Sequence, residues 1–149
     1  MRVSTRFSDS IHILAFIEIY KNIRLSSEVI ANSVETSPVV VRRLMGVLRE
    51  AGLIATKQGS AEPKLARKPR EITLLDIYFA TEGNKPLFEL DKKTNPDCIV
   101  GGNIQEVLGD YYEQAKIAAQ RKLNDTTLQD LIETILVKQK AKDSNKDAK

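Results

Sequence analysis

The chain has 149 residues, of which 42% are apolar and 29% are charged, so it can form one domain with a core, or one domain with an appendage. Its apolar runs are far shorter than the ~20 residues that span a bilayer, and its first residues do not form a secretory signal. A single cysteine, Cys98, excludes an internal disulfide and indicates a reducing compartment. We therefore expect a cytoplasmic protein with no membrane partner.

The net charge of +3 conceals a division along the chain. Residues 1–70 hold 12 Lys/Arg against 6 Asp/Glu, whereas residues 71–149 hold 11 against 14. This division predicts a polyanion partner for the first half only.

Motifs for catalysis and for metal binding are absent from the sequence. There is one histidine, His12, and there is no phosphate-binding glycine loop and no nucleophile elbow. One His and one Cys do not assemble a catalytic set, so we expect no enzyme and no metal site. We interpret His12 as a surface or packing residue.

Three helices are predicted in the first third of the chain. The first covers residues 7–23, with Ser8 or Asp9 as its cap. The second follows the capping residue Ser26, and the third follows the capping residue Ser37 and runs from Pro38 to about Ala51. Gly52 then suits the left-handed conformation that ends many helices. The residues predicted to face inward are Val29, Ile30 and Val34 in the second helix and Val41, Leu44, Met45 and Leu48 in the third.

A small hairpin and a fourth helix are predicted next. Residues 53–56 and 64–66 have strand character and flank a polar turn. The fourth helix begins at Thr73, with Asp76 completing a capping box, and ends near residues 82–84. It is apolar almost all round, from Leu74 to Phe79, so we expect it to be buried.

The remainder is predicted as a loop over residues 83–102, a long helix over 103–122, a last helix capped by Asp125 or Thr126, and a disordered tail over 138–149. An apolar stripe follows the long helix. The stripe either packs on its own domain or contacts a symmetric partner. A partner is the simpler explanation, because this helix follows a small domain that is already complete and needs another surface to cover it. Its residues, which we predict as a dimer interface, are Ile104, Val107, Leu108, Tyr111, Ala115 and Ala118.

This order of elements is that of a winged helix-turn-helix. The predicted fold is mainly α with a small β-hairpin: residues 1–82 form a DNA-binding domain, 83–102 a sensor-type loop and 103–137 a dimerisation helix with a terminal helix. A recognition helix enters the major groove with its N-terminus first, and arginine can fork onto guanine or pair with phosphate. A winged helix that contacts only protein remains the alternative. The residues predicted to contact DNA are Thr5, Arg6, Ser26, Ser37, Val39, Val40, Arg42, Arg43, Arg49, Lys57, Gln58 and Ser60.

Several segments resemble the Rrf-two (Rrf2) family of bacterial transcription regulators. They are AGLI at 51–54, LARKP at 65–69 and ITLLDI at 72–77, together with residues 1–6 and 37–48. The resemblance covers most of residues 1–125 and implies a homodimeric winged-helix repressor with a long crossing dimer helix. Such a dimer sets two recognition helices about 34 Å apart, one turn of DNA, and reads a palindromic operator.

The sequence departs from the family pattern at two places. Members that sense iron, redox state or nitric oxide hold an iron–sulphur cluster through three cysteines in the loop, and Cys98 alone argues against such a cofactor here. In the wing, Gln58 stands where the family carries an arginine that enters the minor groove, with Lys57 beside it.

Two interpretations of Cys98 remain open. It is either a half-buried packing residue or a thiol sensor whose pKa is lowered by the dipole of the dimer helix. Asp97 beside it opposes thiolate formation. The leading hypothesis is a homodimeric repressor that a signal read at the loop or the dimer helix releases from its operator, and a redox response through Cys98 is one such signal. The alternatives are a cluster-free regulator controlled by a protein partner or a metabolite, and a winged-helix protein-interaction module.

Overall fold

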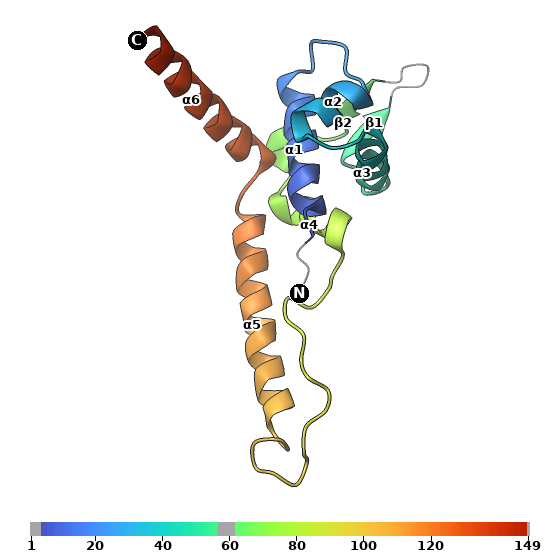
Figure 1. Ribbon diagram of the computed structural model, residues 1–149, viewed down its shortest axis with the longest axis vertical. Helices are drawn as coiled ribbons and strands as arrows, with labels where there is room; N and C mark the ends of the chain where they lie inside the picture. Colours follow the sequence, from blue (N-terminus) through green and yellow to red (C-terminus); the bar gives the residue numbers. More distant parts are fainter. Residues whose placement is uncertain (1–3, 57–61, 149) are drawn as a thin grey trace.

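The computed structural model describes residues 4–56 and 62–148 and has two parts (Figure 1). A head contains residues 4–82 with the first turns of the last helix. An arm, made of residues 83–124, projects from it. Within the arm an extended segment runs out and the long helix α5 returns beside it. Lys57, Gln58 and Ser60, predicted at the wing tip, lie outside the described residues.

The first three helices are α1 (Arg6–Ile19), α2 (Ser27–Val34) and α3 (Pro38–Glu50). Two of the predicted caps are confirmed. The Ser26 hydroxyl accepts a hydrogen bond from the Val29 amide at 3.2 Å, and the Ser37 hydroxyl accepts one from the Val40 amide at 3.3 Å. Gly52 has a φ of 75°, the left-handed conformation that a residue with a Cβ rarely adopts.

Two details of these helices were predicted wrongly. Helix α1 begins after Thr5 and ends at Ile19, so Ser8 and Asp9 lie in its first turn rather than at its cap, and residues 20–23 form a turn instead. Val29 is 41% exposed because Ile30 and Ala31 form the buried face of α2.

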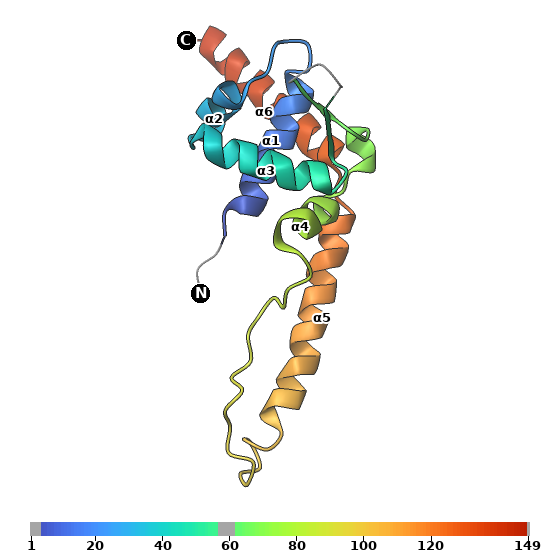
Figure 2. The same cartoon turned by 90° about the vertical axis from the view of Figure 1, so that its right-hand side faces the viewer.

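The hairpin pairs β1 (Ile54–Thr56) with β2 (Pro63–Leu65) in antiparallel register, with Ile54 opposite Leu65. A short 3-10 turn, η1 (Pro69–Glu71), then leads to α4 (Leu74–Glu82). The predicted strands differ by about one residue at their ends. The hairpin follows α3 directly and packs on α1 and α3, so it lies at the C-terminal end of α3 (Figure 2).

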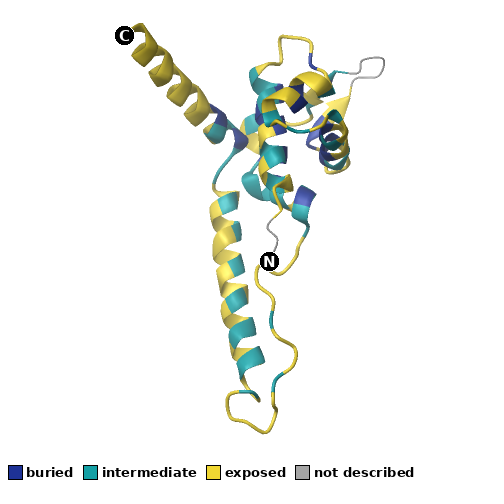
Figure 3. Cartoon of the chain, viewed as in Figure 1, coloured by how far each residue is buried: buried dark blue, intermediate teal, exposed yellow. Residues whose placement is uncertain are grey.

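The core lies within the head, where the buried residues gather (Figure 3). All four residues predicted to face inward from α3 are buried in it. The largest side chains with almost no exposure are Ile13, Leu14, Ile17, Ile30, Leu44, Leu48, Leu53, Ile72, Ile77 and Leu128.

Helix α4 has the predicted capping box but not the predicted burial. The Thr73 hydroxyl accepts from the Asp76 amide at 3.0 Å, and the Asp76 carboxylate accepts from the Thr73 amide at 3.0 Å. Only Ile77 and Thr81 are buried, and Phe79 is 41% exposed. Helix α4 packs on α1, α3 and α5, and Phe79 lies on a side of the helix that stays open to solvent.

The last two helices are α5 (Ile104–Asn124) and α6 (Leu128–Asp147). Thr127, rather than Asp125 or Thr126, caps α6, in a capping box with Asp130. The prediction of a disordered tail from Lys138 is wrong, because α6 continues to Asp147. Lysine, which favours helix, recurs at residues 138, 140, 142 and 146, and Gln139 Nε2 donates to Asp143 Oδ1 one turn on, at 2.8 Å.

The starts of α4 and α6 lie side by side and are bonded to each other. Thr73 and Thr127, the two capping residues, face each other in an antiparallel bridge. The Leu74 amide donates to the Thr126 carbonyl at 2.9 Å, and the Leu128 amide donates to the Ile72 carbonyl at 2.8 Å. We call this the twin-cap junction. Its hydrogen bonds hold the end of the arm against the head.

Candidate nucleic-acid interface and sensor loop

The exposed face of α3 follows from its buried face. Because Val41, Leu44, Met45 and Leu48 point into the core, the positions between them point outward. Val39 is 56% exposed, and Arg42, Arg43 and Arg49 are exposed, as predicted. Val40 differs from the prediction, because it is half-buried against the core.

The arginines of α3 differ in their surroundings. The Arg42 guanidinium lies 3.9 Å from the Glu28 carboxylate of α2, and both side chains are largely exposed, so this pair holds Arg42 only weakly. Arg43 has no ion pair with any described residue. Of these two arginines, Arg43 is therefore the freer one for a polyanion.

The remaining predicted contacts lie at helix starts. Ser26 and Ser37 are exposed caps, and the free backbone amides beside such caps attract anions. Thr5 precedes α1 without using its side chain as a cap, and Arg6 beside it is exposed.

Arg67 forms a structural contact that the sequence alone did not reveal. Its Nη1 lies 3.3 Å from Asp76 Oδ2, and its Nη2 donates to the Glu71 carbonyl. Asp76 is also part of the capping box of α4. Arg67 thereby joins the exit of the hairpin to the twin-cap junction. The LARKP segment and the capping box were both visible in the sequence, but their contact depends on the fold.

Cys98 lies in a series of tight turns between the extended segment and α5. The Gly102 amide donates to the Cys98 carbonyl at 2.8 Å, and Thr94 Oγ1 donates to the Gly101 carbonyl at 2.6 Å. The thiol is exposed, so the interpretation as a half-buried packing residue is wrong. Hydrogen bonds from the Gly101 and Val100 amides lower the pKa of the Cys98 thiol. The cause is these local amides rather than the predicted helix dipole, since α5 begins only at Ile104.

The predicted dimer stripe on α5 is not covered by its own head. Val107 is 47% exposed and Tyr111 is 63% exposed, while Ile104 and Leu108 are half-buried. Ala115 and Ala118 are also exposed. The structure therefore does not support the alternative that this stripe packs on its own domain.

The described part of the chain also bears on metal binding and on membrane insertion. No group of three or more His, Cys, Asp or Glu side chains there could hold a metal ion. None of the helices described is long and apolar enough to cross a membrane. His12 is exposed, and its Nε2 lies 2.8 Å from the Ser33 hydroxyl, which agrees with a surface role.

A model of the Rrf2 family, described as "Iron-dependent Transcriptional regulator", matches residues 3–134. The chain belongs to the Rrf2 family. It is 35% identical over 130 residues to the "Putative HTH-type transcriptional regulator YwnA" of Bacillus subtilis (strain 168), a match that covers 87% of this chain and 96% of that protein. Like its Rrf2 relatives, the chain is a DNA-binding transcription regulator and not an enzyme.

Solved Rrf2 structures share the fold. The crystal structure of Staphylococcus aureus CymR superposes with a TM-score of 0.65 at 25% identity, over 87% of this chain and 97% of CymR. IscR of T. potens superposes with a TM-score of 0.67 at 24% identity, over 91% of this chain and 88% of IscR. The expected fold, helical with one antiparallel hairpin, is confirmed.

Iron–sulphur clusters occur in this family, and such a cluster requires a particular set of donor side chains. A cluster held by three cysteines needs three thiolates, and the whole chain contains only Cys98, which is exposed. The residues of one chain do not fit such a cluster.

Proposed function

We propose that the chain is a cytoplasmic, homodimeric repressor that binds a palindromic operator. The observation that carries this proposal is the division between an exposed basic face on α3 and an exposed apolar stripe on α5. The α3 face suits DNA, and the α5 stripe suits a second copy of the chain. The two lie on different parts of the molecule, so both can be engaged together (Figure 1).

In this proposal the N-terminal half of α3 enters the major groove. Arg43 is exposed and has no ion pair with a described residue, so its guanidinium can donate two hydrogen bonds to the edge of a guanine. Arg42, Arg49 and the exposed helix starts bind phosphates. Thr5 and Arg6 add phosphate contacts, and the wing residues Lys57, Gln58 and Ser60 contact the neighbouring backbone.

Dimerisation places two such faces on one side of the assembly. An isologous contact between α5 stripes buries Val107 and Tyr111, which would otherwise stay in water. A spacing of about 34 Å between the recognition helices then matches one turn of DNA.

We further propose that Cys98 is the redox-responsive group. The thiolate sulfur attacks one oxygen of a peroxide, the O–O bond breaks, hydroxide leaves and a sulfenic acid forms. This new polar group lies just before the dimer helix, from which it can shift the two heads relative to each other. A protein partner or metabolite acting on the same loop is the alternative signal.

The test is selection of genomic DNA fragments by the purified protein, with and without mild peroxide. We expect one enriched palindrome, which Cys98→Ser still binds under oxidant but wild type releases. Arg43→Ala should lose base discrimination by about tenfold to a hundredfold, whereas the matched control Arg121→Ala, on α5, should not. Binding that is indifferent to salt and sequence would sink the DNA interpretation, and release by the oxidised Cys98→Ser variant would sink the sensor.

A further inference from the structure

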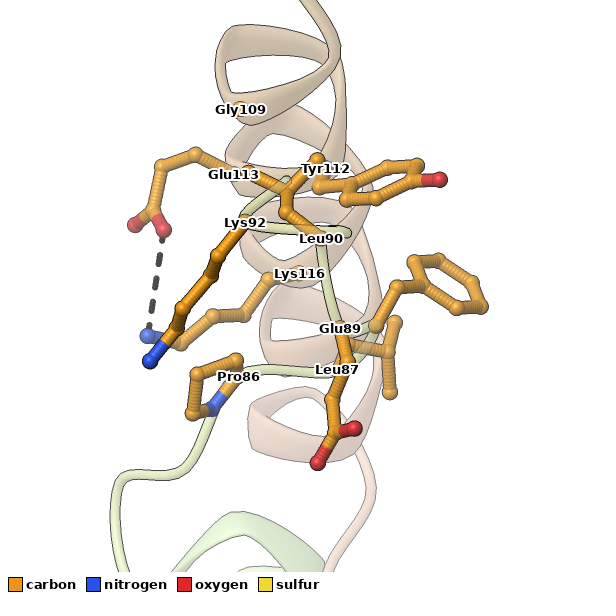
Figure 4. Close-up of a pocket in the computed structure, with 10 residues that line it drawn as sticks. Pro86, Leu87, Glu89, Leu90, Lys92, Gly109, Tyr112, Glu113 and Lys116 are labelled. Carbon is orange, nitrogen blue, oxygen red and sulfur yellow. Dashed lines mark ion pairs between the residues drawn. The ribbon is translucent and has the colours of Figure 1, made fainter. Parts of the chain in front are cut away.

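A pocket with a volume of about 490 Å³ lies in the arm, between residues 86–92 and one face of α5 (Figure 4). This volume falls within the range of small-molecule sites. From the helix the pocket is lined by Gly109, Tyr112, Glu113 and Lys116. At about 100° per residue, these positions are turned well away from the Val107–Tyr111 stripe. Tyr112 lies only about 40° from Leu108 of the stripe, whereas Gly109 and Lys116 lie on the far side of α5. A second copy on the stripe therefore leaves the lysine side of the pocket open.

The pocket has an apolar side. Phe88 and Tyr112 pack their rings together at 5.1 Å between centroids. Pro86, Leu87 and Leu90 continue this surface, and Leu87 and Phe88 are still 37% and 44% exposed. Apolar side chains gathered in a concave site gain free energy when a ligand removes them from water.

The pocket also has a cationic side. The ammonium groups of Lys92 and Lys116 lie on the side away from the Tyr112 ring (Figure 4). The Lys116 side chain is only 18% exposed, and its Nζ lies 3.8 Å from Glu113 Oε2, too far for a hydrogen bond. Glu113 itself is 60% exposed. Glu89 also lines the pocket, but its carboxylate points away from both ammonium groups (Figure 4). A largely covered ammonium with one loose carboxylate partner, together with a second lysine in the same lining, suits an anion.

We propose that this pocket binds a small organic carboxylate with an aromatic or aliphatic body, as the effector of the repressor proposed above. The carboxylate pairs with Lys116 and Lys92, and the body lies against Tyr112 and Phe88. The ligand joins residues 86–92 to α5 and so fixes the arm that carries the dimer stripe. The inference rests on the proposed function for its regulatory meaning, but the binding site stands on its own residues.

The experiment uses hydrocinnamate as the probe and its neutral amide as the comparison, titrated into the full-length protein by nuclear magnetic resonance. We expect saturable binding of the carboxylate and at least about tenfold weaker binding of the amide. Lys116→Met should weaken carboxylate binding by about tenfold, while the control Lys93→Met, on the neighbouring exposed lysine, should leave it unchanged.

A second variant fills the pocket from the helix. A Cβ added at Gly109 would lie 3.7 Å from Leu90, an ordinary contact, and a side chain there also favours helix. Gly109→Met should therefore stay folded, as checked by circular dichroism, and should abolish carboxylate binding.

The inference would be overturned by equal affinity for acid and amide, by no effect of Lys116→Met, or by no saturable binding of hydrocinnamate below about 10 mM. Affinity that falls as the protein is concentrated would assign the pocket to a second copy and would also overturn it. DNA selection on the same samples separates the two proposals. If the protein selects DNA but does not bind the probe, only the proposal of a carboxylate site is rejected. If it binds the probe but does not select DNA, only the proposal of a repressor is rejected.

Discussion

The head and the arm use their apolar residues in opposite ways. The head places the large side chains of α1, α3 and the hairpin into one core, where many have almost no exposure. Helix α5 in the arm has 21 residues and none of them is buried. Both parts have regular helices, so the difference lies in what covers them.

This difference indicates that the head is stabilised by its own packing, whereas the arm leaves its apolar stripe for the second copy proposed above. Burial of apolar area is the main favourable term in folding, and the isolated arm gains little of it. The twin-cap junction and Arg67 connect the two parts. These hydrogen bonds join the end of the arm to the start of α4 in the head.

The largest expected effect is in the head. Leu14→Ala removes a fully buried side chain and should cost about 2–5 kcal/mol of the free energy of unfolding. The control Leu136→Ala, at a site 50% exposed on α6, should change it by about 0.5 kcal/mol or less. Urea denaturation measures both. Equal costs at the two sites would mean that the core is not the source of the stability of the head.

The next effect is on assembly. Tyr111→Asp places a charge in the proposed dimer stripe and should convert the dimer to a folded monomer, seen by light scattering with an unchanged unfolding midpoint for the head. DNA affinity should fall by about a hundredfold, because one recognition helix is lost from each complex. The control Gln120→Asp lies on the opposite side of α5. If Tyr111→Asp stays dimeric, the stripe is not the interface.

The sequence predicted features that depend on neighbouring residues. The hydroxyl caps Ser26, Ser37 and Thr73 were found because a cap bonds to an amide two or three residues ahead. The α3 core face was found because its period is regular. Burial of α4 was predicted wrongly, because an apolar helix does not reveal which of its sides will be covered.

Features that join distant segments were not predictable from local pattern. The Thr73–Thr127 bridge, the pocket between residues 86–92 and α5, and the Arg67–Asp76 pair all require the fold. The outward position predicted for Val40 differs from the structure for a smaller reason. Its place in the first turn of α3 predicted a side chain facing solvent, but the side chain packs against the core.

A smaller effect is expected at the junction of the two parts. Thr127→Ala removes the hydroxyl of the α6 cap and should cost about 1 kcal/mol of the free energy of unfolding. Hydrogen exchange should show faster opening at the Leu128 amide, which bonds to Ile72 in the head. Thr134→Ala, within α6, is the matched control. Unchanged exchange at Leu128 would show that the cap does not hold the junction.

The smallest expected effect is on the pH dependence of the reactivity of the Cys98 thiol in the arm. Amides of Gly101 and Val100 lower the pKa of Cys98, so the thiolate should persist to lower pH in the folded chain than in the unfolded chain. The rate of alkylation by iodoacetamide, measured against pH, should therefore reach its half-maximum at lower pH without urea than with urea. Identical profiles would remove the electrostatic basis for a sensor at Cys98.

The most direct test of the account is the mass of the complex between the protein and the DNA that it selects. We predict two chains on each palindrome, one chain or none on an isolated half-site, and affinity that falls steeply as salt rises. Arg43→Ala should keep the two-chain mass and lose sequence preference. One chain on each full site, or binding unaffected by salt, would contradict the account.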